Sequence, residues 1–228
     1  MCGRGQGTPE IARVGACVEL LHSLVRPHSH QSRMPPLFES AHFVVRDLRP
    51  DQIPVLQALF EANPDYFIAV NGKAPDADEA QREFDELPPA HLTYSARWFA
   101  GIFDHSHSLR GLIILVSDLA ARSVWHTALF FLERSHRGTG AALEIHASLE
   151  AMALASGAQW LRLGVIAGNL PAERFWAKCG YLEVRTRQLV NAAGEERTSR
   201  VMVKPLAGGA LADYLQRVPR DAPSSPLP

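Results

Sequence analysis

The chain has 228 residues, of which 46% are hydrophobic and 21% charged, and its formal net charge at pH 7 is -1. These values are typical of one globular domain with its own core, and they exclude a protein that a strong overall charge draws to nucleic acid. No apolar run approaches the ~20 residues of a membrane span. The three cysteines are far apart, which predicts no disulfide framework. We therefore expect a cytoplasmic protein without a membrane or nucleic-acid partner.

Both ends of the chain differ in composition from its middle. Residues 1–36 have a glycine-rich start, apolar residues at spacings of three and four, and a proline-rich end, which predicts a poorly ordered or helical N-terminal extension. Residues 207–228 end in a segment rich in proline and serine, and we expect a C-terminal tail there. The domain proper is predicted to cover residues 37–206.

Strand and helix patterns alternate through the first half of this domain. A strand at 41–48 precedes a helix at 50–62, and after a loop a second helix at 78–87 stops at two prolines. Three strands then follow with only short turns between them, which predicts an antiparallel meander. These strands cover residues 96–104, 111–120 and 123–132.

The second half begins with a helix over residues 138–157, which is predicted to end at Gly157. A strand at 160–167 and a helix at 169–180 come next, and Asn169 is the expected cap of that helix. The domain ends in a strand pair over 181–190 and 197–206. We expect the arginines of this pair to form a solvated face rather than a nucleic-acid patch; they are Arg185, Arg187, Arg197 and Arg200.

The segment between the third meander strand and the next helix has the chemistry of an anion site. Residues 136–143 read HRGTGAAL. The first amides of a helix have no partner inside the helix, and the helix dipole places partial positive charge there. Two glycines allow an anion to approach the backbone, and Arg137 adds a full positive charge. The natural ligand is a phosphate or pyrophosphate, although a tight turn with an arginine in water is the simpler alternative.

Two separate motifs resemble the GNAT superfamily of acyl-CoA-dependent N-acyltransferases. The first family motif, Gln/Arg-x-x-Gly-x-Gly/Ala, reads SHRGTG at residues 135–140, with Ser135 in place of the usual first residue. The second motif reads NLPAERFWAKCGY at residues 169–181, where Trp176 replaces the family's usual tyrosine. The resemblance covers about residues 41–205.

The resemblance implies a mixed α/β fold with a mostly antiparallel central sheet and helices on both faces. It further implies that the strands at 123–132 and 159–167 splay apart and that acetyl-CoA, used as a co-substrate, lies in the gap. No metal is implied. The residues that the resemblance assigns to the cofactor are Phe131, Leu132, Arg137, Gly138, Thr139, Gly140, Ala141, Asn169 and Trp176.

The resemblance also implies N-acetyl transfer to a primary amine by direct attack on the thioester. His126 occupies the place of the usual base, and a core histidine satisfied by a backbone group is the alternative. Tyr66, with Asp65, is a further acid or base candidate, because Trp176 cannot deliver a proton usefully. The acceptor stays open between a small molecule and a peptide amine, and so does a homodimer. A degenerate acyl-CoA-binding module or sensor without efficient turnover is the competing function.

Overall fold

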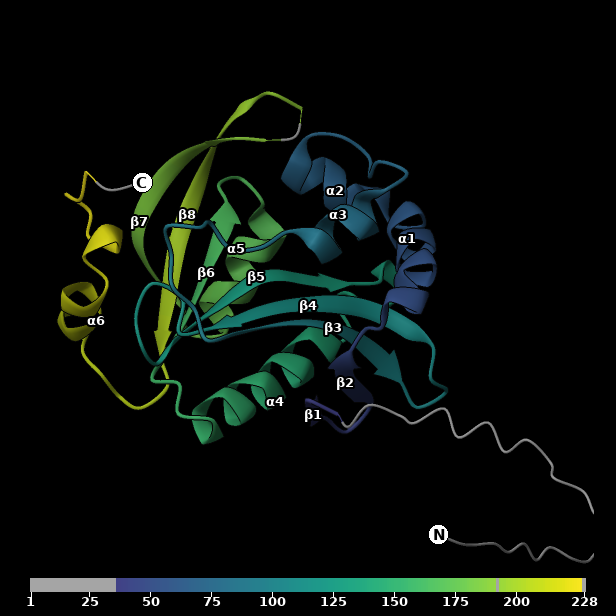
Figure 1. The fold of residues 1–228 in the computed structure, drawn as a ribbon, viewed down its shortest axis with the longest axis horizontal. Coiled ribbons are helices and arrows are strands. Elements are labelled where there is room, and N and C mark those ends of the chain that lie inside the picture. Colours follow the sequence, from purple (N-terminus) through teal and green to yellow (C-terminus); the bar gives the residue numbers. More distant parts are fainter. Residues whose placement is uncertain (1–35, 192, 227–228) are drawn as a thin grey trace, which may run out of the picture. The chain divides into compact units, whose positions relative to one another are not determined.

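The computed structural model describes residues 36–191 and 193–226. The N-terminal extension predicted for residues 1–36 therefore lies outside the described residues, apart from residue 36. The described part is built around one eight-stranded sheet (Figure 1), with the strand order β1-β2-β3-β4-β5-β6-β8-β7. The strands are β1 (Phe38–Glu39), β2 (Phe43–Asp47), β3 (Ala96–Asp104), β4 (Leu109–Ser117), β5 (Val124–Leu132), β6 (Trp160–Ile166), β7 (Leu182–Val190) and β8 (Glu196–Pro205).

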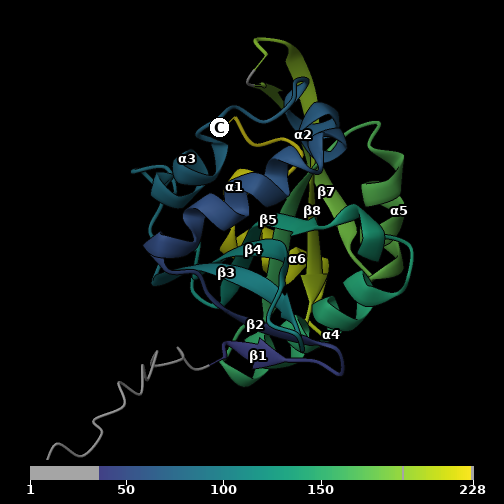
Figure 2. The ribbon, with the colours of Figure 1, turned by 90° about the vertical axis from the view of Figure 1, so that its right-hand side faces the viewer.

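Helices cover both faces of this sheet, as the sequence predicts. The helices are α1 (Ile53–Glu61), α2 (Pro64–Asn71), α3 (Glu79–Asp85), α4 (Ala141–Ala155), α5 (Leu170–Lys178) and α6 (Leu211–Arg217). Figure 2 shows α1, α2 and α3 on the side of the sheet opposite to α4. The longest of them, α4, has 15 residues, and no helix of the described residues is both long and apolar enough to cross a membrane.

The alternation of side chains along β5 and β6 divides the core between the two faces. Trp125 and Leu161 pack with buried residues of α4 and α5. Their chain neighbours Val124 and Trp160 point to the other face, where they pack with Tyr214 of α6. A separate cluster on that second face joins α1, α2 and α3 to β3, β4 and β5. The second face is thus covered by helices in two separate places.

β5 and β6 are the only parallel neighbours in the sheet of the described residues, and they part after a short ladder. Four residue pairs join them, from Val124 with Trp160 to Thr127 with Leu163. Beyond that point β5 pairs with β4 alone and β6 with β8 alone. A bulge also interrupts the pairing with β4, because Leu115 faces Thr127 and Ile114 faces Leu129, leaving Ala128 unopposed. The predicted splaying of these two strands is present.

Two helices fall where the sequence analysis expects none. The segment between α1 and α3, expected to be a loop, contains α2, which begins at Pro64 and ends at Gly72 with a φ of 77°. Residues 207–226, expected to be a tail, contain α6 and a 3-10 turn at Pro219–Asp221. Tyr214 and Asp221 are completely buried. The second of these helices packs on the sheet, and the turn after it contributes to the pocket described below.

Candidate active site

The glycine-rich segment lies at the start of α4, immediately after β5, as predicted. Gly138 and Gly140 have φ angles of 78° and 96°, a left-handed conformation that strongly favours glycine. A Cβ atom added to either residue would meet no other atom within 4 Å. Among the described residues, no hydrogen bond occupies the amides of Gly138, Thr139 and Gly140. These exposed amides at a helix N-terminus fit a phosphate group of acetyl-CoA.

The side chain of Arg137 turns away from these amides. Its Nε donates to the carbonyl oxygen of Leu132 over 2.7 Å, and its Nη1 donates to the carboxylate of Asp65 on α2. The amide of Arg137 donates to the carbonyl of Arg134 over 3.1 Å. Arg137 therefore joins the end of β5 to the first turn of α2. The open anion donors of this loop are the three amides that follow it.

The second motif places aromatic residues beside the gap between β5 and β6. Asn169 caps α5, and its Oδ1 accepts a hydrogen bond of 3.3 Å from the amide of Ala172. Trp176 is buried, with its ring centroid 5.7 Å from that of Phe130 on β5 and 5.2 Å from that of Tyr181. These contacts make Trp176 part of the core wall next to the gap. Its position fits the packing role better than that of a proton donor.

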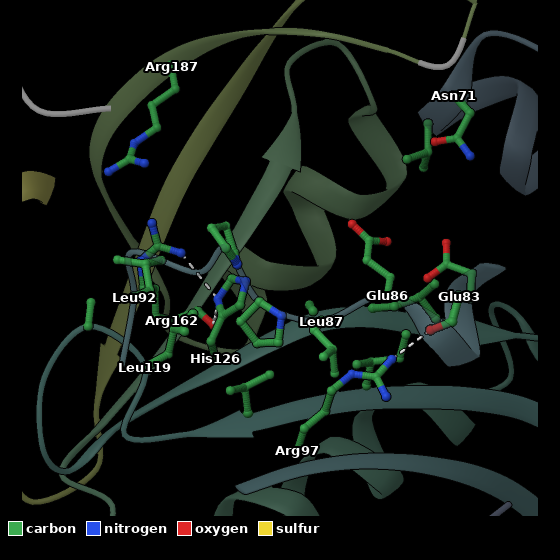
Figure 3. Close-up of a pocket in the computed structure, with 18 of the residues that line it drawn as sticks. Asn71, Glu83, Glu86, Leu87, Leu92, Arg97, Leu119, His126, Arg162 and Arg187 are labelled. Carbon is green, nitrogen blue, oxygen red and sulfur yellow. Dashed lines mark hydrogen bonds between the residues drawn. The ribbon is translucent and has the colours of Figure 1, made fainter. Parts of the chain in front are cut away.

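A pocket of about 400 Å³ opens on the other face of the sheet, between the α1–α3 layer and the C-terminal segment. Its apolar wall includes Leu87, Pro88 and Leu92 from the segment after α3, and Ile114 and Leu129 from the sheet. The unopposed Ala128 of the bulge lines it as well. Polar and charged side chains also line this pocket, and Figure 3 labels all of them except Tyr66 and Arg220. They are Tyr66, Asn71, Glu83, Glu86, Arg97, His126, Arg162, Arg187 and Arg220.

His126 lies in the wall of this pocket and is half-buried. Its Nδ1 is 3.1 Å from the carbonyl oxygen of Arg162 and 3.2 Å from Nη1 of the same arginine. Burial, together with the positive charge of Arg162, lowers the pKa of His126 to about 3. The imidazole is therefore neutral at physiological pH, and it is a weak base. The alternative given in the sequence analysis, a histidine satisfied by a backbone group, describes its contacts.

Tyr66 and Glu83 lie on the opposite wall. Burial and the charge of Glu83 raise the pKa of the Tyr66 hydroxyl, so this side chain stays protonated. Its ring packs edge-on against Phe131 with the centroids 5.1 Å apart. Burial, followed by the charges of Glu86 and Glu79, raises the pKa of the Glu83 carboxyl to about 7. A carboxyl group with a pKa near neutrality is suited to take a proton from an amine.

The structure thus separates the predicted site residues into two groups. The glycine loop, Asn169 and Trp176 surround the start of α4 and the gap, while His126 and Tyr66 line the pocket on the other face. Sequence reasoning did not single out Glu83: the acidic residues around 76–86 are compatible equally with attraction of a cationic amine and with a solvated helix face. The only sequence signal was its position three residues before Glu86, which does not reveal that Glu83 faces a pocket. Among the described residues, no group of three or more His, Cys, Asp or Glu side chains could hold a metal.

Known structures share the fold of this chain. An acetyltransferase from Thermus thermophilus is 19% identical, with a TM-score of 0.54 over 72% of this chain and 96% of its own. A spermidine N-acetyltransferase from Vibrio cholerae, solved with CoA and spermine, is 16% identical, with a TM-score of 0.55 and coverages of 72% and 96%. A GNAT-family acetyltransferase from Bacillus anthracis is 9% identical, with a TM-score of 0.58 and coverages of 74% and 98%. At these identities the likeness establishes the fold.

The family assignment comes from the sequence. The chain has no significant match among curated protein sequences. The family model described as "Acetyltransferase (GNAT) family" matches residues 56–181, which is more than half of the 228 residues. The match contains both motifs, the gap between β5 and β6 and most of the pocket wall. With its glycine loop, splayed strands and mixed sheet in the corresponding places, the chain belongs to the acetyltransferase (GNAT) family.

Proposed function

We propose that this protein transfers the acetyl group of acetyl-CoA to a primary amine by direct attack of the amine on the thioester. One observation carries the proposal. The open amides at the start of α4 and the pocket with its titratable side chains lie on opposite faces of the sheet, and the sheet is open between β5 and β6 beyond Thr127. The amides of residues 138–140 are free for a pyrophosphate, and β5 has an unpaired edge beyond Thr127. The pocket reaches that strand at Ala128 and Leu129.

In the proposed reaction the amine nitrogen forms a bond to the carbonyl carbon, and the carbon–sulfur bond then breaks. The amine loses one proton, and the departing CoA thiolate takes up one, so charge is conserved. We assign Glu83 as the base that takes the proton from the amine, because its pKa of about 7 matches neutral pH, whereas the pKa of His126 is about 3. Tyr66 keeps its proton and lines the same pocket, so it is the candidate donor to the thiolate.

The acceptor and the cellular location belong to this proposal as expectations. The acceptor is a small-molecule or peptide amine, and the protein works in the cytoplasm without a metal. The pocket favours turnover over the alternative of a binding module, because a protein that only senses acyl-CoA has no need for a second pocket containing a carboxyl group with a pKa near 7.

Titration calorimetry with acetyl-CoA tests the cofactor part of the proposal. Gly138→Glu places a negative charge in the open loop and should abolish measurable binding. Gly157→Glu is the matched control, because Gly157 also has a positive φ, of 90°, and open space around it. It lies beyond the far end of α4, whose 15 residues span about 22 Å at 1.5 Å per residue. Both variants carry the same backbone strain and the same added charge.

Release of free CoA thiol in the presence of an amine panel then tests catalysis. Binding by the wild type and by Gly157→Glu, lost in Gly138→Glu, supports the assignment of the loop. Equal weakening in both variants argues that the loop is not the site, and no binding by a folded wild type removes the cofactor assignment. Binding without acetylation of any amine in the panel favours the non-catalytic alternative.

A further inference from the structure

The pocket carries opposite charges at its two ends. Figure 3 shows Arg162 and Arg187 on one side, and Glu83 and Glu86 on the opposite side. The sheet strands β4 and β5 form the floor between them. A molecule that fills the pocket should therefore carry complementary charges, negative near the arginines and positive near the glutamates.

Three observations mark the positive end as a site for an anion: its arginines lie together, their charge exceeds that of the carboxylate beside them, and one of their donor atoms has no hydrogen-bond partner among the described residues. Arg162 of β6, Arg187 of β7 and Arg220 of the C-terminal segment all line the pocket. They surround one carboxylate, that of Asp221, which accepts hydrogen bonds from Arg162 and Arg187, the shortest from each being 2.7 Å long. Arg162 and Arg187 share this one carboxylate, which leaves an excess of positive charge between them. The Nε of Arg187 is buried and has no hydrogen-bond partner among the described residues.

Such an excess of like charge is unfavourable without a further anion. Burial lowers the pKa of Arg187; Asp221 opposes this effect, and the charges of Arg162, Arg220 and Arg185 add to it. Burial and the charge of Arg162 also lower the pKa of Arg220. A bound carboxylate or phosphate would relieve this repulsion and accept a hydrogen bond from Nε of Arg187. The positive end therefore fits an oxyanion.

The negative end has the opposite character. The carboxylates of Glu83 and Glu86 line the pocket together with the side-chain amide of Asn71. Arg97 is nearby, but its guanidinium donates to the backbone carbonyls of Glu83 and Phe84, over 2.6 and 3.3 Å. Two carboxylates beside one guanidinium attract a cationic amine. Its ammonium proton is released to solvent before the attack, and the neutral amine gives its second proton to Glu83 during the reaction.

We propose that the acceptor is a small amine that carries an oxyanion at a distance from its nitrogen, with the anion held by Arg187 and the amine facing Glu83. The inference rests on the proposed acetyl transfer and adds the substrate class to it. The reaction is unchanged: the nitrogen–carbon bond forms, the carbon–sulfur bond breaks, and CoA leaves as the thiol. The oxyanion stays intact and serves only to position the amine.

The dimensions of the pocket suit a free metabolite. A volume of about 400 Å³ is in the usual range for small-molecule sites. A second hollow shares His126, Ala128, Arg162 and Arg187 with the pocket and continues over β6, β7 and β8. The anionic end of the acceptor therefore has room beyond the first pocket. A carboxylate and a phosphate would make the same contacts there.

Matched acceptor pairs test this proposal. Each amino acid whose amine and carboxylate lie at opposite ends of a short carbon chain is compared with its carboxamide, and 2-aminoethyl phosphate with ethanolamine, by the rate of thiol release from acetyl-CoA. We expect kcat/KM to be at least about tenfold higher for the anionic member of the preferred pair, the scale of one charge-assisted hydrogen bond. The amino acids and the phosphate separate the two sources of the oxyanion.

Variants of Arg187 then test whether this arginine causes the preference for the anionic member of each pair. Arg187→Gln should reduce the ratio between the two members of the pair to about one, mainly through KM, and Arg187→Lys should restore part of it. Arg197→Gln is the matched control, because Arg197 lies on the same hairpin, pairs with Glu195 over 2.6 Å and is outside the pocket. It should keep both the ratio and the rate. Circular dichroism confirms that each variant is folded.

A binding measurement makes the result independent of turnover. The N-acetylated product of the preferred amino acid, titrated in the presence of CoA, should bind more tightly than its carboxamide in the wild type and equally in Arg187→Gln. A wild type that acetylates neutral and anionic members equally well overturns the charge assignment and leaves acetyl transfer intact. A wild type that binds acetyl-CoA but prefers neither product in titration overturns the inference as well. Absence of acetyl-CoA binding would instead count against the proposed function.

Discussion

Arg162 on β6 and Asp221 in the C-terminal segment form a two-point ion pair. Nε and Nη2 of the guanidinium donate to the two carboxylate oxygens over 2.7 and 3.1 Å. Asp221 has no exposed surface, and Tyr214 donates a further hydrogen bond to it over 2.5 Å. Burial raises the pKa of Asp221, but the contacts with Arg162 and Tyr214 outweigh burial and hold it below its ordinary value. The pair connects the segment after β8 to the wall of the pocket.

Asp221→Asn should destabilise the protein by about 3 kcal/mol or more, because it leaves buried guanidinium groups without their counter-charge. Urea unfolding followed by circular dichroism measures the change. Asp51→Asn is the control: Asp51 also pairs with an arginine, Arg49, over 2.9 Å, but its side chain is 66% exposed. It should change the free energy of unfolding little. Similar effects for both variants would contradict a stabilising role of the buried cluster.

The pH dependence of turnover should identify the base. With a pKa of about 7, Glu83 gives a kcat that rises as pH increases through neutrality, because only the deprotonated carboxylate accepts the amine proton. Glu83→Gln should remove this rise and lower kcat by about 100-fold or more. Glu86→Gln should move the rise to lower pH, because the charge of Glu86 raises the pKa of Glu83. The measurement is a kcat profile across neutral pH, from mildly acidic to mildly basic buffers.

The variant His126→Gln is the control for this pH profile of kcat. The pKa of His126, about 3, places its titration below the measured range, so His126→Gln should keep the rise near pH 7. A rise that disappears in His126→Gln and persists in Glu83→Gln would reverse the assignment and restore the histidine as the base.

His146 should make the fold sensitive to mild acid. It is buried on α4, and its Nε2 lies 3.1 Å from the Tyr181 hydroxyl. Burial, with a contribution from Lys204, lowers its pKa to about 4. Because the unfolded chain takes up this proton first, the associated stability is complete above about pH 6.5 and decreases as pH falls towards 4. The decrease is on the order of 3 kcal/mol.

His146→Gln keeps a donor near Tyr181 but does not titrate in this range. Its free energy of unfolding should therefore fall less steeply than that of the wild type between about pH 6.5 and about pH 4. Urea titrations at several pH values in this interval measure the difference. Parallel curves for the two proteins would show that His146 does not govern the acid response.

Trp176 should prove to be a core residue. Its ring packs against those of Phe130, Phe175, His146 and Tyr181, with centroid distances of 4.7 to 5.7 Å. Trp176→Ala should cost about 3–5 kcal/mol of stability. Thermal and urea unfolding measure the loss, and Leu182→Ala, a change at an exposed apolar residue, is the control. A loss near zero would mean that the indole is not part of the packed wall.

Local patterns predicted most of the strands, the α4 and α5 helices and the glycine loop, because each depends on residues adjacent in the chain. The start and stop signals of α2, Pro64 in its first turn and Gly72 as its C-cap, were present in the sequence, but its eight residues were too few to show a clear apolar face. Such local patterns carry no information about contacts between residues far apart in the chain. Arg187 read as part of a solvated hairpin, whereas the structure places it in a pocket against Asp221, 34 residues later.

Asp221 follows β8, the last strand of the sheet in chain order, and this affects the order in which the pocket is completed. A ribosome completes the whole family-matching region, residues 56–181, before it makes the residue that neutralises part of the arginine cluster. A product that ends between residues 187 and 221 therefore contains Arg162 and Arg187 without the carboxylate that they share. Recognition of an acceptor should therefore depend on the segment after β8, whereas the glycine loop lies wholly within the family-matching region.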